Sequence, residues 1–200
     1  MYSAIVGLFI IILISYLVFE RNKKKIKNLL QIIDGKVKAS YLKSSITGDW
    51  IGNKVNVTIQ RGNRTEFLYI TFFNALNESL SIRIKPIAKS KLSVFSRSLK
   101  WLRCPTSIKL QEEEIEVFSK KNDEKEIMEF LTSKRRSYIK NIFIRGFEFI
   151  DINGTKKAGF IKIGIEPNKF EVDKQEISDI LVNPSNINEA LTDLKNISDS

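Results

Sequence analysis

The stretch KVNVTIQRGNRTEFLYITFF, residues 54–73, gives the clearest indication of the fold. Its two arms, 54–60 and 65–73, are short and rich in β-branched and aromatic residues, which is the composition of strands. The connector Arg61-Gly62-Asn63 is short enough for a hairpin. The stretch therefore predicts two neighbouring antiparallel strands.

Segments on both sides continue this pattern. Residues 36–46 and 79–85 predict further strands of one antiparallel meander, and 106–110 with 114–120 predict a pair around the acidic turn at Glu112–Glu114. Residues 147–166 predict a hairpin with Asn153-Gly154 at its turn. We therefore expect one mainly antiparallel sheet.

Helical periodicity appears in two places. Residues 123–142 begin with acids and end with cations, an order that suits the helix dipole. Residues 173–200 predict two short helices separated by Pro184, with capping-box spacing at Asp173 and Glu176 and at Asn186 and Glu189. The predicted fold class is α+β: a mainly β domain over 36–172 with inserted helices, partly covered by them, followed by the two C-terminal helices.

The N-terminal segment has a different character. Residues 2–19, YSAIVGLFIIILISYLVF, carry no charge, and 18 helical residues extend about 27 Å, close to the hydrocarbon thickness of a bilayer. Five cations follow this run within residues 21–27, and none precedes it. Because such cations stay on the cytoplasmic side, we expect a single-pass protein of the inner membrane with its N-terminus outside and its C-terminal domain in the cytoplasm.

Residues 20–35 predict a basic juxtamembrane helix that Gly35 ends. Its apolar stripe consists of Ile26, Leu29, Leu30 and Ile33 at three- and four-residue spacing. The stripe could pack on the chain's own domain or on a second copy, and we favour its own domain.

Composition limits the chemistry. The 200 residues include 42% hydrophobic and 28% charged residues with a net charge of +10, values that fit one folded, basic domain. The chain has no histidine and one cysteine, Cys104, which excludes histidine-dependent catalytic triads, histidine-ligated zinc and a CxxC redox pair. We predict no catalytic residues, no metal site and no cofactor, and hence a protein that is not an enzyme.

The longest basic stretch is residues 79–111, with eight cations and no acid. Leu92, Phe95, Leu99 and Leu102 fall on one helical face, with cations to one side and Trp101 roughly opposite. This pattern allows a crossover helix that packs on the sheet, which we favour, an interfacial membrane contact, or a nucleic-acid site. The aromatic residues are not spaced as in an RNA-stacking platform, so nucleic acid is the least expected partner.

The candidate contact with anionic headgroups combines both basic segments. Its residues are Arg21, Lys23, Lys24, Lys25, Lys27, Arg97, Lys100, Trp101 and Arg103. Each cation near an anionic lipid surface contributes about 1 kcal/mol of attraction.

Gly48, Trp50, Gly52 and Val55 form the pattern G-x-[WY]-x-G-x-x-V. With the apolar N-terminus, the stretch 116–131 and the late hairpin, the chain resembles uncharacterised bacterial single-pass membrane-anchored proteins over most of its length. That resemblance implies an architecture and no activity. It also implies that Gly48 and Gly52 shape the turn that enters the second strand.

Together these observations predict a membrane-anchored protein whose basic cytoplasmic domain is a binding or scaffolding module at the membrane surface. The expected partners are the lipid bilayer with its anionic headgroups, and a protein partner or a second copy of the chain. Two alternatives stay open: an enzyme that uses neither histidine nor metal on a membrane-proximal substrate, and a membrane-tethered nucleic-acid binder.

Overall fold

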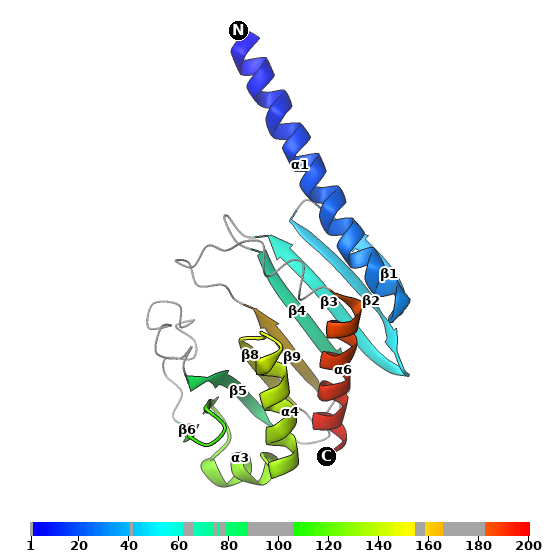
Figure 1. Cartoon of the computed structure of the whole chain (residues 1–200). Coiled ribbons are helices and arrows are strands. Elements are labelled where there is room, and N and C mark those ends of the chain that lie inside the picture. The colour runs from blue at the N-terminus through cyan, green and yellow to red at the C-terminus, as the bar shows by residue number, and fades with distance from the viewer. Residues whose placement is uncertain are drawn as a thin grey trace.

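The structure is a computed structural model that describes residues 2–40, 42–61, 66–73, 76, 79–87, 106–154, 159–165 and 183–200. Within the first helix it describes side chains from residue 6 onward, except at 11, 18, 22 and 25. These residues form a sheet that helices cover on one face, and a long N-terminal helix projects from it (Figure 1).

The described strands form one antiparallel sheet of nine strands in the order β1-β2-β3-β4-β9-β8-β5-β7-β6. In chain order they are β1 Asp34–Ala39, β2 Lys43–Trp50, β3 Asn53–Arg61, β4 Glu66–Phe73, β5 Ser81–Pro86, β6 Thr106–Leu110, β7 Ile115–Ser119, β8 Phe149–Asn153 and β9 Phe160–Ile165.

The hairpin predicted over 54–73 is confirmed as β3 and β4, with Val57 opposite Ile70. Val57 and Ile70 begin a row of facing residues across the sheet, because Ile70 lies opposite Ile163 and Ile163 lies opposite Ile150. All four side chains are fully buried. The alternation of side chains along each strand thus puts one apolar face of the sheet into the core.

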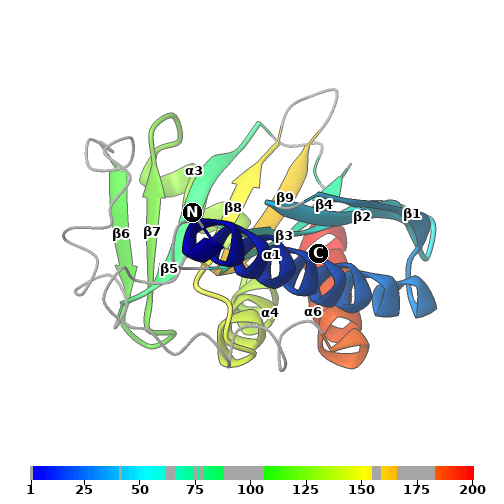
Figure 2. The same ribbon diagram turned by 90° about the horizontal axis from the view of Figure 1, so that it is seen from above.

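The helices cover that apolar face. They are α1 Tyr2–Asn28, followed by the short 3-10 helix η1 Leu29–Gln31, then α3 Glu124–Phe130, α4 Ser133–Ile144 and α6 Pro184–Asp199. Helices α4 and α6 pack side by side, and the C-terminal part of α1 lies over β1, β2 and β3 (Figure 2). The indole Nε1 of Trp50 on β2 donates to Asn188 Oδ1 on α6 at 2.8 Å, which ties the sheet to this layer.

The single helix predicted over 123–142 is wrong, because the chain forms α3 and α4 there. Leu131 ends the first, and the Thr132 hydroxyl accepts from the Arg135 amide at 3.3 Å to cap the second. Asp123 forms the capping box of α3 with Glu126. Near the C-terminus the cap of α6 is Asn183, with Pro184 at the first helical position, so Asn186 is not the cap. The helix predicted from 173 lies outside the described residues.

Three further predictions, two about strands and one about a helix end, are also wrong. Residues 36–46 belong to two paired strands, β1 and β2, since the chain reverses after Ser40. Gly35 lies within β1, opposite Gly48, and ends no helix. A Cβ on Gly48 would be 2.1 Å from the Asp34 carbonyl oxygen, so this close strand approach requires glycine. The meander ends at β4, because β4 pairs with β9 while β5 pairs with β7 and β8.

The predicted transmembrane helix at 2–19 is wrong. In the described part of the chain, no helix combines the length with the apolar character that crossing a bilayer requires. The apolar run and the predicted juxtamembrane helix are one continuous helix, which carries charges from Glu20 onward and is held by the sheet at its C-terminal end. Three predictions depended on that transmembrane helix and are wrong with it: the single-pass topology, the inner-membrane location and the membrane component of the fold class.

Candidate functional site

Helix α1 is divided into two halves with opposite surroundings. In the C-terminal half Ile26 is fully buried, as are Leu29 and Ile33 immediately after the helix, and all three belong to the core cluster. The predicted apolar stripe thus packs on its own domain, although Leu30 is 45% exposed and lies outside it. This half fixes the direction in which the rest of the helix projects (Figure 1).

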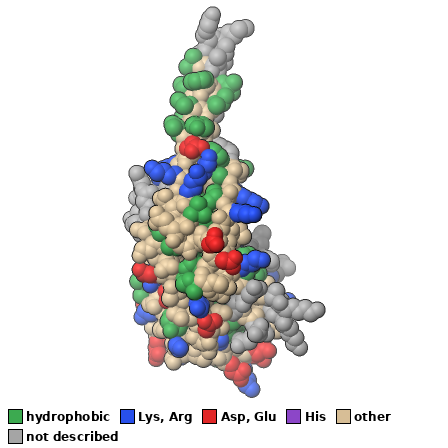
Figure 3. All heavy atoms as spheres, turned by 90° about the vertical axis from the view of Figure 1, so that its right-hand side faces the viewer, with side chains coloured by type: hydrophobic (Ala, Val, Ile, Leu, Met, Phe, Trp, Pro, Cys, Tyr) green, Lys and Arg blue, Asp and Glu red, His purple; other side chains and the backbone are tan. Residues whose placement is uncertain are grey.

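The N-terminal half, residues 6–17, is here called the apolar arm. Its described large side chains are between 48% and 68% exposed: Val6, Leu8, Phe9, Ile10, Ile12, Leu13, Ile14, Tyr16 and Leu17. Successive helical residues point about 100° apart, so these side chains face all directions around the axis. Figure 3 shows apolar side chains along the projecting arm, above the body of the molecule.

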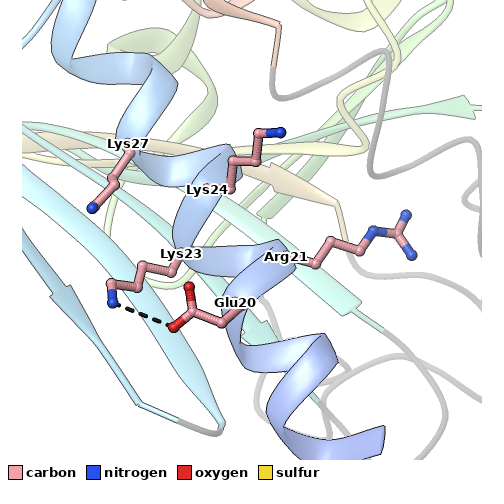
Figure 4. A pocket seen from close by; sticks show the side chains of 5 residues that line it. All are labelled: Glu20, Arg21, Lys23, Lys24 and Lys27. Carbon is pink, nitrogen blue, oxygen red and sulfur yellow. Dashed lines mark hydrogen bonds and ion pairs between the residues drawn. The ribbon is translucent and has the colours of Figure 1, made fainter.

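The C-terminal half also carries a basic patch, defined by Arg21, Lys23, Lys24 and Lys27. Together with Glu20 these residues line a hollow of about 340 Å³ beside the helix. Arg21 and Lys24 extend to one side, and Lys23 and Lys27 to the other (Figure 4). The Lys23 ammonium lies 3.4 Å from the Glu20 carboxylate and 5.5 Å from the centre of the Phe19 ring.

The structure brings together only part of the predicted headgroup contact. Arg21, Lys24 and Lys27 are exposed and Lys23 is partly buried, and all four line the same hollow beside α1. Lys25 lies on the same helix, but its side chain is not described. Arg97, Lys100, Trp101 and Arg103 lie outside the described residues, so the three interpretations of the stretch 79–111 stay predictions.

A group of cationic and aromatic side chains, on the face of the sheet opposite the helices, was missed by the sequence analysis. The Arg83 guanidinium lies 4.4 Å from the centre of the Phe149 ring and pairs with Asp151 at 3.4 Å, while the Lys162 ammonium lies 3.9 Å above the Tyr69 ring. Phe149 is 1% exposed and Arg83 6%. The ion pair and the two cation–π contacts join β4, β5, β8 and β9, so the group stabilises the fold.

Gly164 explains how these rings can meet. It lies between Tyr69 and Phe149 in the strand register, and a Cβ there would be 2.7 Å from each ring. The two ring centres are 6.2 Å apart. The glycine therefore allows the aromatic side chains to lean over the backbone of β9.

The acidic turn does not gather its carboxylates. Glu113 forms an ion pair with Arg136 of α4 at 2.5 Å, whereas Glu116 lies on β7 and accepts from the Ser107 hydroxyl at 3.1 Å. Within the described ranges no three acidic or cysteine side chains are placed to hold a metal ion. The segment forms the turn between the antiparallel strands β6 and β7, where the sequence predicts one.

One carboxyl of the helical layer has an altered pKa. Asp193 on α6 is 6% exposed, and desolvation by burial raises the pKa of its carboxyl, while the hydrogen bond from Arg145 at 3.3 Å lowers it. Arg145 also pairs with Glu189. The arrangement joins α4 to α6.

Comparison with known protein families, curated proteins and solved structures finds no match to this chain. The features available for assigning a function are therefore the apolar arm and the basic patch of α1. The resemblance to membrane-anchored bacterial proteins stays a prediction.

Proposed function

We propose that this chain is a scaffold that works by binding, and that the apolar arm of α1 joins it to further copies of itself. The observation that supports the proposal is the exposure of the arm, where each described large apolar side chain is about half exposed or more. Folded monomers rarely expose a continuous apolar surface larger than a few hundred Å². A surface of this kind marks a binding element.

The distribution of the apolar side chains indicates the kind of partner. Leu13, Ile14, Tyr16 and Leu17 are all exposed, although they point in different directions around the helix. A shallow groove covers only one side of a helix, whereas a helix that is apolar all round is stable when it is surrounded. Arms from other copies can surround it, because every copy supplies the same apolar surface.

The energetics require most of the arm to take part. Covering a half-exposed apolar side chain contributes on the order of 1 kcal/mol, since complete burial is worth about 1.5–3 kcal/mol. Association costs roughly 4–15 kcal/mol in lost freedom of motion. One or two contacts cannot offset that cost, but the whole arm can, and we therefore expect a bundle of arms.

Sedimentation equilibrium of the full chain tests the proposal. The wild type should have at least twice the mass of one chain at micromolar concentration, and the double variant Phe9→Glu/Leu13→Glu should approach the mass of one chain. Both side chains lie outside the core, so the body should stay folded. Ile144→Glu is the matched control, because Ile144 is 73% exposed on α4, away from the arm.

Two results would contradict self-association. One is a wild type with the mass of a single chain at every concentration. The other is an arm variant whose mass equals that of the wild type. If the full chain floats with neutral phosphatidylcholine vesicles and remains a single chain, the arm binds a partner other than copies of itself.

A further inference from the structure

We infer that the basic patch is a binding site for a multivalent phosphate-bearing anion. This inference is independent of self-association, since it rests on different residues of α1. The ligand class is defined by its phosphate groups. Its two sources are a free polyphosphate and a lipid headgroup, and the two assays below distinguish them.

The first argument is the density of charge. Residues 20–27 hold five cations and one acid, and their Cα atoms span about 10 Å along the helix. That distance is about one Debye length at 0.1 M salt, so the fields of the cations add in the hollow. A multivalent anion gains more from such a field than a monovalent one.

The second argument is the arrangement of like charges along the helix. Arg21 and Lys24 are three residues apart, as are Lys24 and Lys27, while Lys23 and Lys27 are four apart. Each of these spacings places like charges on neighbouring turns of the helix, which destabilises it. The one described acid of the group, Glu20, pairs with Lys23 and leaves Lys24 and Lys27 without an acidic partner among the described residues. A bound anion would relieve this repulsion.

The third argument is access combined with a fixed scaffold. Arg21, Lys24 and Lys27 are exposed, but the helix that carries them is anchored through Ile26 and Leu29, which are fully buried. Their backbone is therefore held in place, and the exposed Lys24 and Lys27 side chains are accessible to a ligand. Arg21 adds a planar guanidinium that can bind two phosphate oxygens at once.

Calorimetric titration of the full chain with sodium tripolyphosphate is the test. The wild type should bind, and raising the salt concentration should weaken binding. Arg21→Gln/Lys24→Gln should reduce the affinity at least tenfold. Lys54→Gln, which removes an exposed lysine from β3, is the matched control and should bind as the wild type does. Thermal unfolding of each variant checks that the fold is intact.

A parallel flotation assay uses phosphatidylcholine vesicles with and without phosphatidic acid. If tripolyphosphate binds and the double variant loses that binding, the site recognises free phosphate groups. If binding appears only with phosphatidic acid and is lost in the same variant, the source is the lipid headgroup. Absence of binding in both assays would overturn the inference, as would equal binding by wild type and double variant.

Discussion

The two halves of α1 belong to one helix but are stabilised in different ways. In the C-terminal half Ile26 is fully buried against the sheet, whereas in the N-terminal half Phe9 is 68% exposed. The sequence composition of the two halves suggests the opposite assignment, since the exposed half is apolar and the buried half carries the cations. The comparison shows that side-chain direction, and not average composition, decides which half belongs to the body.

Removal of a core contact at the buried end should have the largest effect. Leu29→Ala should lower the free energy of unfolding by about 2–5 kcal/mol, because it leaves a cavity where the side chain is fully buried. The control Leu30→Ala, where the leucine is 45% exposed, should change it by much less. Urea denaturation at a fixed protein concentration measures both. Equal losses in the two variants would show that α1 does not pack as described.

A smaller effect, of opposite sign, is expected at the β2–β3 turn. Ile51 has φ of 48° and Gly52 φ of 74°, so a β-branched residue occupies a left-handed position. Ile51→Asn should raise the free energy of unfolding by about 1 kcal/mol, because Asn-Gly suits a turn with two positive φ values. The same urea denaturation detects the gain, while the mass of the assembly should stay unchanged. A loss of stability would contradict the strain assigned to Ile51.

Local patterns in the sequence predicted local structure well. The hairpin at 54–73 and the pair at 106–120 follow from alternation and turn residues, which act between close neighbours in the chain. The basic patch could also be found, because its four cations lie within seven residues. The break at Leu131 was missed because a Thr132 cap competes with helix continuation, and the sequence does not show which will prevail.

Pairing between distant segments could not be predicted in the same way. Nothing near β5 in the sequence indicates that it lies between β7 and β8. The group of Arg83, Asp151 and Lys162 was missed for the same reason, since the strand that carries Arg83, β5, meets the β8–β9 hairpin only in the folded sheet. The length of the apolar run predicted a membrane span, but the run alone does not show where the helix ends or what its other half contacts.

Disulfide trapping within the apolar arm tests the central claim most directly. In a Cys104→Ser background, Ile12→Cys places a thiol in the middle of the arm, and Ile144→Cys places one on the body at a more exposed position. If arms of different copies pack together, oxidation should link chains through position 12 much faster than through position 144. Equal rates, or faster linkage at position 144, would contradict self-association through the arm.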